Sequence, residues 1–126
     1  GDGWAGYARP FRTLEDVHVQ AAVAAHVVGE ALRRDWPASL VASLAGCLAR
    51  LAQCAQYAPD DPHGHLLLAA AERELQQAAG QVNELVVGQD DAFARDWRAN
   101  HLLVALAAPA RAARLAKALA VLRAAP

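Results

Sequence analysis

Apolar side chains recur every three or four residues through four long stretches of this chain, a spacing typical of helices with one buried face. The stretches cover residues 13–34, 37–58, 61 or 62–87, and 90–123. Alanine supplies 33 of the 126 residues and leucine 17, while isoleucine is absent. Alanine and leucine favour helices, and β-branched residues favour strands. The sequence therefore predicts an all-α fold.

Residues that start or stop helices separate the four stretches. Thr13 is the predicted N-cap of the first helix, and Asp90 of the fourth. The first helix should end before Pro37, because the residue preceding a proline avoids the helical region. The sequence at residues 58–62, Ala-Pro-Asp-Asp-Pro, predicts a turn, and Gly88 suits the position just after a helix.

The short connections predict that consecutive helices lie side by side and run in opposite directions. We expect an antiparallel up-down-up-down four-helix bundle over residues 13–126, preceded by an extended lead-in over residues 1–12. Pro109 lies within the fourth stretch and should kink or split that helix, because proline removes a backbone donor and clashes one turn back.

The apolar positions indicate which faces are buried. The first helix should bury a stripe made by Leu14, Val17, Ala21, Ala24, Val28 and Ala31. Val19, Val23 and Val27 widen this stripe. The second helix should bury one stripe: Leu40, Leu44, Cys47, Leu51, Cys54 and Ala58. The third helix should bury another: Leu68, Ala71, Leu75, Ala78, Val82 and Leu85. The apolar side of the fourth helix should carry Phe93, Trp97, His101, Val104, Ala108, Leu115, Leu119 and Leu122. The third helix should turn a polar face to solvent, made by Glu72, Arg73, Gln76, Gln77, Gln81 and Glu84. Basic residues near the end of the fourth helix complement its dipole: Arg111, Arg114, Lys117 and Arg123.

Charge and cysteine spacing bear on partners and location. The net charge is −1, with a pI near 6.6, which argues against binding to nucleic acid or to an anionic membrane. Cys47 and Cys54 lie seven residues apart in one predicted helix, about 10 Å along its axis and too far for a disulfide. We interpret them as buried free thiols in a reducing cytoplasm. The chain begins at Gly1 without a methionine, which suggests processing or a piece of a longer protein.

Five histidines are the obvious candidates for chemistry. His63 and His65 are two apart and do not share a helix face, so a solvated helix start is favoured over a metal site. His18 and His26 lie on one side of the first helix, where the alternatives are hydrogen-bonded interior histidines and a pH-sensitive or ligating pair. His101 falls on the apolar face of the fourth helix, as a satisfied core group. We expect no metal site.

No set of catalytic residues emerges. Glu15 and His18 form one Glu-x-x-His pattern, but a di-iron carboxylate bundle needs two. Ser39 and Ser43 lack the Gly-x-Ser-x-Gly setting of a nucleophile, and glycine-rich phosphate loops are absent from the sequence. The remaining acids are interpreted as surface charges of unknown role, namely Glu72, Glu74, Glu84 and Asp90.

Three aromatic residues, Trp4, Tyr7 and Phe11, lie in the predicted lead-in. Side chains of this size need a surface to rest on. They either fold back onto the bundle or contact an upstream domain or a second subunit, because aromatic anchors are enriched at interfaces.

The first nineteen residues resemble a segment of a subgroup of acyl-CoA dehydrogenase-like flavoproteins. There, a Gly-Asp-Gly-aromatic stretch runs into Pro-Phe-Arg-Thr-x-Glu-Asp-x-His just ahead of the C-terminal helical domain. This chain has Gly1-Asp2-Gly3-Trp4 followed by Pro10-Phe11-Arg12-Thr13-Leu14-Glu15-Asp16-Val17-His18. Two later segments are also similar to the last helix of that subgroup, Arg95-Asp96-Trp97-Arg98 and Ala110-Arg111-Ala112-Ala113-Arg114-Leu115.

The resemblance implies that this chain is the C-terminal helical domain only. In a full-length relative, FAD binds between this domain and a middle β domain and across a subunit contact, and the helical domains build a homo-oligomer. The upstream β domain would be the partner on the same polypeptide. The domain would serve assembly and form one wall of the flavin and acyl-CoA cleft, with no flavin bound by this chain alone.

This sequence also departs from the family pattern. The Arg-x-x-Phe-Gly motif that meets the flavin is absent, and the corresponding region reads Glu30-Ala31-Leu32-Arg33-Arg34-Asp35-Trp36-Pro37. The glycine-rich stretch near the base is also absent. No catalytic or cofactor-binding residue is therefore assigned. The alternative function is a free-standing helical bundle whose groove binds a partner helix.

Overall fold

The computed structural model describes residues 9–101 and 108–125. Over these residues the chain forms helices joined by turns, with no strand. The helices are α1 (Arg9–Arg33), α2 (Ala38–Cys54), α3 (Pro62–Leu85), α4 (Ala92–Asn100) and α5 (Ala108–Ala124). The predicted all-α class is confirmed for this part of the chain.

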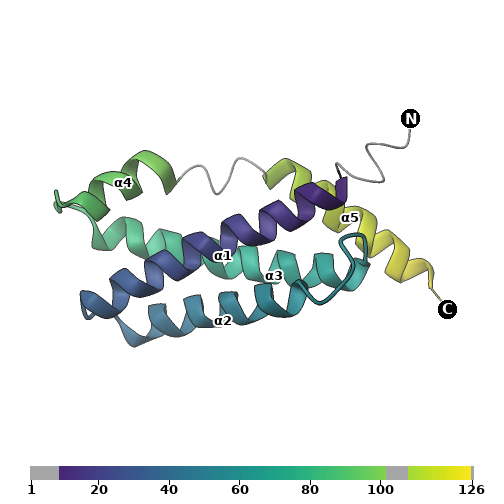
Figure 1. Ribbon diagram of the computed structural model, residues 1–126, viewed down its shortest axis with the longest axis horizontal. Helices are drawn as coiled ribbons and strands as arrows, with labels where there is room; N and C mark the ends of the chain where they lie inside the picture. The colour runs from purple at the N-terminus through teal and green to yellow at the C-terminus, as the bar shows by residue number, and fades with distance from the viewer. Residues whose placement is uncertain (1–8, 102–107, 126) are drawn as a thin grey trace.

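The three longest connected helices run back and forth. Figure 1 shows α1, α2 and α3 alternating in direction along the long axis of the molecule. Helix α2 packs against both α1 and α3, and α5 packs against α3 near the start of that helix. Helix α4 lies at the opposite end, above the C-terminal end of α3 (Figure 1), and its Phe93 ring also contacts His26 of α1.

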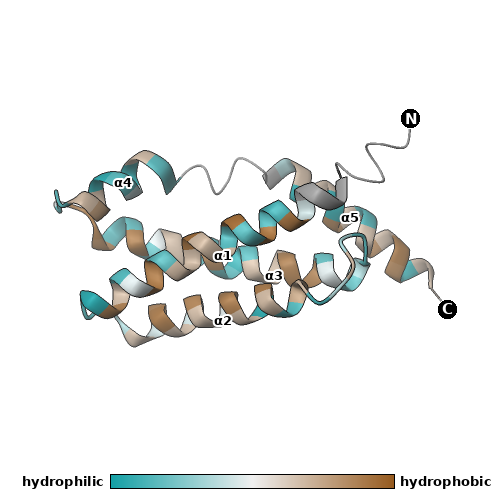
Figure 2. Ribbon diagram, in the orientation of Figure 1, coloured by the Kyte–Doolittle hydropathy of each residue, from teal (hydrophilic) through white to brown (hydrophobic). Residues whose placement is uncertain are grey.

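The core lies where α2 and α3 face each other. Every buried position of α2 belongs to the predicted apolar stripe: Leu40, Leu44, Cys47, Leu51 and Cys54. Helix α3 contributes Leu68, Ala71, Leu75, Ala78 and Val82, also as predicted. Figure 2 shows apolar bands recurring along α2, whereas α4 is largely hydrophilic. Fully burying one leucine contributes about 1.5–3 kcal/mol, so these stripes hold the helices together.

Small groups bring α2 and α3 close to each other. The Cys47 thiol donates to the Ala71 carbonyl, and the Cys54 thiol donates to the Gly64 carbonyl, each at 3.3 Å. A Cβ atom added at Gly64 would lie 3.2 Å from Tyr57 Cβ. Glycine at this position therefore permits the close approach of the turn before α3.

Several predicted helix ends are corrected by the structure. Helix α1 begins at Arg9, so Thr13 lies inside it and residues 9–12 are not extended. Proline at position 10 is tolerated because first-turn amides have no partner within the helix. Pro37 is the N-cap of α2 rather than its first residue, and α2 ends at Cys54 instead of residue 58.

Two aspartates set the starts of α3 and α4. Asp61 caps α3 by accepting a hydrogen bond from the His63 amide at 2.9 Å. Asp91, not Asp90, caps α4 through the Ala94 amide, also at 2.9 Å. Gly88 lies in the turn between α3 and α4 and has φ +77°, the left-handed conformation expected just beyond a helix end.

The predicted fourth helix corresponds to α4 and α5. Pro109 lies in the first turn of α5, a position that accommodates proline. Residues 102–107 lie outside the described part, so the kink or split predicted near Pro109 stays a prediction. Residues 1–8 and the side chain of Phe11 also lie outside it, and with them the expectations for Trp4, Tyr7 and Phe11.

The buried face of α1 differs from the predicted stripe. Val17, Ala24 and Ala31 are buried as expected, but Leu14 and Val19 are 41% and 49% exposed. The face that turns inward also carries polar side chains, because Asp16 is 9% exposed and Gln20 is fully buried.

Candidate functional site

A buried cluster of charges joins α1, α3 and α5. Arg111 Nε of α5 donates to Asp16 Oδ2 of α1 at 2.8 Å, and Arg114 Nη2 donates to the same oxygen at 3.0 Å. Arg111 Nη1 lies 3.0 Å from Glu72 Oε1 of α3, and Gln20 Nε2 donates to Asp16 Oδ1 at 3.3 Å. The Arg111 side chain is only 7% exposed. The cluster therefore balances two cations against two anions inside the fold.

This cluster corrects two sequence interpretations. Arg111 and Arg114 lie in the first two turns of α5, away from the C-terminal end where a dipole would favour them. Glu72 is half-buried and paired, not a surface charge. Burial lowers the pKa of Arg111, but the hydrogen bonds and negative charges of Asp16 and Glu72 together outweigh burial, so the pKa lies above its usual range. Arg111 therefore stays charged inside the protein.

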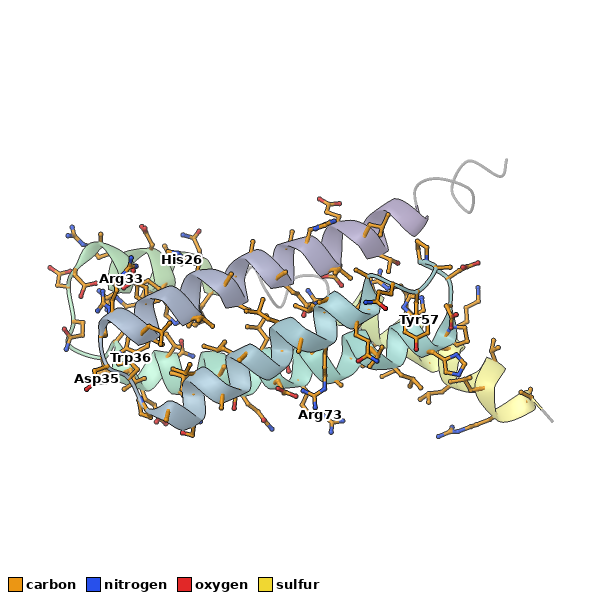
Figure 3. The ribbon with its side chains drawn as sticks, turned by 60° about the horizontal axis from the view of Figure 1, so that its bottom comes forward. His26, Arg33, Asp35, Trp36, Tyr57 and Arg73 are labelled. Carbon is orange, nitrogen blue, oxygen red and sulfur yellow. The ribbon has the colours of Figure 1, made fainter. Side chains whose placement is uncertain are left out.

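A pocket of about 340 Å³ opens between α3 and α5 beside this cluster. Its polar walls include His65, Glu72, Arg73 and the two arginines of the cluster. Arg73 points outward from α3 (Figure 3). Burial, and next the neighbouring Arg114 charge, lower the pKa of His65, so the imidazole favours its neutral form.

At the other end of the molecule, Arg34 ties α1 to α4. Its guanidinium makes two hydrogen bonds of 2.9 Å to the carboxylate of Asp91 and one of 2.9 Å to Glu30. It also lies 5.1 Å from the Phe93 ring centroid and 5.6 Å from the Trp36 centroid. The hydrogen bond from Arg34 holds the pKa of Asp91 well below its usual range. Figure 3 shows Trp36 at this end of the bundle.

A row of rings continues from this contact along α4. The His26 and Phe93 centroids are 5.5 Å apart, those of Phe93 and Trp97 are 6.1 Å apart, and those of Trp97 and His101 are 5.8 Å apart. Trp97 Nε1 donates to Asn83 Oδ1 at 2.7 Å, which fixes the indole. His26 comes from α1 and lies on the side toward α4 (Figure 3).

The rings line a cleft of about 480 Å³ between α1 and α4. Its lining residues are Ala22, Val23, His26, Val27, Phe93, Asp96, Trp97, Asn100 and His101. This volume falls in the range of small-molecule sites, about 300–1,000 Å³. We call it the α1–α4 cleft.

The histidines are thus divided between different settings. His26 and His18 are exposed, so neither is an interior histidine, and only His26 reaches the α1–α4 cleft. His101 is half-buried and its Nδ1 lies 3.0 Å from the Trp97 carbonyl, as a satisfied group. His63 sits at the solvated start of α3, with Nδ1 3.1 Å from Asp61 Oδ1.

The remaining predicted residues are distributed over the surface and the core. Cys47 and Cys54 are buried free thiols, as predicted, and burial raises the pKa of Cys47 to about 11. Glu74 is half-buried and pairs with Arg50, so its interpretation as a surface charge is wrong. Glu84 and Asp90 are exposed, and so are Glu15 and Ser39, while Ser43 is half-buried.

Neither a metal centre nor a membrane span is found in the part of the chain that the structure describes. Across residues 9–101 and 108–125, no three histidine, cysteine or acidic side chains gather closely enough to hold a metal ion. Within the same ranges, no helix combines the length and the apolar character needed to cross a bilayer.

Comparison with known proteins returned no protein family, no curated protein and no solved structure that matches this chain. The site residues must therefore be interpreted from their own geometry. The charged groups of the cluster are paired with one another, so the cluster suits a structural role. The α1–α4 cleft leaves polar groups available beside aromatic faces, which suits ligand binding.

Sequence reasoning missed both sites. The buried cluster had one signal, since Asp16 and Gln20 are four residues apart and therefore share a face of α1. The cleft had a signal in the spacing of Phe93, Trp97 and His101, which was attributed to the core.

Proposed function

We propose that this chain is the C-terminal helical domain of an acyl-CoA dehydrogenase-like flavoprotein, serving subunit assembly and one wall of the flavin and acyl-CoA cleft. The similarity of residues 1–19 to that family and the all-helical architecture support the proposal. Helices α4 and α5 would together take the fourth position of an up-down-up-down bundle, with an upstream β domain docked against it. The reduced thiols fit a cytoplasmic location.

The observation that carries the assembly role is the exposure of large aliphatic side chains. Leu32 at the end of α1 is 65% exposed, and Val87 just beyond α3 is 76% exposed. Both belong to the end of the bundle where α1 and α3 terminate (Figure 1). Apolar surface of this kind gains stability when another protein surface covers it. A net charge near zero adds little repulsion between copies.

Sedimentation velocity tests the assembly role. The chain should sediment as a dimer or larger species at micromolar concentrations, and a variant with Leu32→Glu and Val87→Glu should sediment as a monomer. Ala45→Glu, at an exposed site of α2, is the matched control and should behave like the unmodified chain. A strictly monomeric unmodified chain would overturn the assembly role.

The flavin role needs the polypeptide together with its upstream region. That protein, once purified, should show the visible absorbance of bound flavin. FAD added to the present chain alone should leave its melting temperature unchanged, because a single wall of the cleft gives little binding energy. A colourless longer protein that also fails to take up added FAD would remove the flavoprotein assignment.

A second candidate function is a free-standing interaction module, and the setting of Arg34 favours it. Arg34 lies in the segment that replaces the family's flavin-binding motif, and its guanidinium is already engaged by Glu30 and Asp91. Three of its five N–H donors are thereby occupied, which leaves the guanidinium less able to bind a flavin. The gene upstream of Gly1 separates the two functions: a start codon close by, without a β domain in frame, favours the interaction module.

A further inference from the structure

The α1–α4 cleft has a defined distribution of polar and apolar groups. Phe93, Asp96, Trp97, Asn100 and His101 follow the helical spacing that places side chains on one face of α4. Helix α1 supplies an aliphatic wall opposite this face, with His26 at its edge. A ligand in the cleft would therefore meet rings and aliphatic groups along its body and polar groups at one side.

The charged and imidazole groups on the α4 side of this cleft are hydrogen-bond acceptors. The Asp96 carboxylate is exposed, and no side chain in the described ranges forms an ion pair or hydrogen bond with it. The neighbouring Arg95 and Arg98 lie 3.7 Å from Asp90 instead. His101 Nδ1 faces a carbonyl at 3.0 Å and so carries the proton, which leaves Nε2 as the acceptor of the neutral ring.

The aromatic row already holds one cation. Arg34 lies 5.1 Å from the centroid of Phe93, the first ring of α4. The Phe93 and Trp97 rings are nearly parallel, at 16°, with centroids 6.1 Å apart. Parallel rings at this separation are offset, so neither ring covers the full face of the other. Tryptophan presents the most favourable ring face for a cation.

From these observations we propose that the α1–α4 cleft binds a small organic cation, an ammonium group attached to a flat apolar body. The body would lie against Phe93 and Trp97, and the ammonium group would be held by the Asp96 carboxylate and by Nε2 of His101. The cleft carries one formal negative charge and no lysine or arginine among its described lining residues, so an anion is disfavoured. This inference does not depend on the proposed function.

A series of three probes with the same ring tests the proposal. Benzylammonium, benzyl alcohol and benzoate differ in charge but share the phenyl group. Binding should be followed by NMR at about pH 7.5, where the amine is protonated. Benzylammonium should bind about fivefold to tenfold more tightly than benzyl alcohol, as expected for a partly desolvated cation beside a ring and a carboxylate. Benzoate should bind more weakly than both.

Chemical shifts and variants locate the site. The indole N–H of Trp97 and the ring protons of His101 should shift on binding. Asp96→Asn should reduce the preference for benzylammonium over benzyl alcohol to less than about twofold, because the charge is lost while the rings remain. Glu84→Gln removes an exposed acid of α3 outside the cleft and serves as the control. Ala22→Phe, at an exposed lining position, should fill the cleft and abolish binding of all three probes.

Three results would overturn the proposal. They are equal or tighter binding of benzoate, an unchanged charge preference in Asp96→Asn, and shifts confined to residues outside the cleft. The melting temperatures of both cleft variants should match that of the unmodified chain, because both sites are exposed. Should Ala22→Phe fail to fold, Val23→Leu at a half-buried lining position gives a second test, by reducing the affinity for all three probes.

Discussion

At the scale of single residues, Asp16 of α1 holds α5 through two hydrogen-bonded arginines. One of its oxygens accepts hydrogen bonds from both Arg111 and Arg114, and the other accepts one from Gln20. A cation that loses its partner inside a protein retains the full cost of its burial. The stability of the cluster therefore depends on pairing, not on the presence of charge as such.

Replacement of Asp16 tests this dependence. Asp16→Asn should lower the free energy of unfolding by about 3–5 kcal/mol, because it leaves the buried Arg111 charge underpaired. In a double-mutant cycle with Arg111→Met, the two effects should be non-additive by about 0.5–3 kcal/mol. Urea unfolding followed by circular dichroism gives these values. Asp90→Asn, at an exposed acid, is the control, and additive losses would show that the two side chains are energetically independent.

The two thiols give a pH-dependent prediction at the same scale. Burial raises the pKa of Cys47 to about 11 from an ordinary value of 9.0, and it also raises that of Cys54. At pH 8 roughly one Cys47 thiol in a thousand is then a thiolate, the reactive form. Both cysteines should therefore react slowly with a disulfide reagent in the folded protein and quickly in urea.

The raised pKa values of the two thiols should also make the folded protein less stable at alkaline pH. A group whose pKa is raised by folding contributes stability below its unfolded pKa, and this contribution is lost as pH rises to its folded pKa. Unfolding midpoints should thus decrease between about pH 9 and 11, and less so in Cys47→Ala. Fast modification of the native protein at neutral pH would contradict the burial of both thiols.

At the scale of helices, much could be predicted because the signals are local. The seven-residue spacing of Leu40, Cys47 and Cys54 lies within one helix and correctly indicated the buried face of α2. The partners of Asp16 could not be predicted in this way, because Arg111 lies 95 residues away. Pro37 indicated where α1 ends. The start of α1 at Arg9 could not be predicted, because Pro10 is compatible both with the first turn of a helix and with an extended segment.

The docking of α4 depends on two separate roles of Asp91. Its carboxylate caps the helix through the Ala94 amide, and it also holds the Arg34 guanidinium. Asp91→Asn retains a good cap but loses the charge, whereas Asp91→Ala loses both. Near-UV circular dichroism of the tryptophans should change in both variants, and helix content should fall only in Asp91→Ala.

The pH dependence of this contact follows from the pKa of Asp91. Arg34 holds that pKa below its usual range, so the contact contributes stability above the unfolded pKa and loses it as pH falls through the folded pKa. The near-UV signal should therefore persist at mildly acidic pH in the unmodified chain. The same spectrum for both Asp91 variants and the unmodified chain would show that the Arg34 contact does not hold α4.

At the scale of the whole molecule, the helices differ in how they are held. Helices α1, α2 and α3 share a continuous apolar core, in which Leu44 and Leu75 are almost fully buried. Among the α5 residues whose burial the structure describes, 109–124, Ala118 is the one buried hydrophobic residue, and the charge cluster supplies the buried polar contacts. Apolar burial and paired charge respond differently to substitution, so these two parts should open separately.

Native-state hydrogen exchange checks this division. Amides of α2 and α3 should show the slowest exchange, and amides of α4 and α5 should exchange faster through local opening. Asp16→Asn should speed exchange in α5 further by weakening its attachment, while it changes α2 far less. The same variant leaves the Arg34 contact intact, so exchange in α4 should follow that of the unmodified chain. Equal protection in all five helices, or equal acceleration by Asp16→Asn, would instead mean that the molecule opens as one cooperative unit.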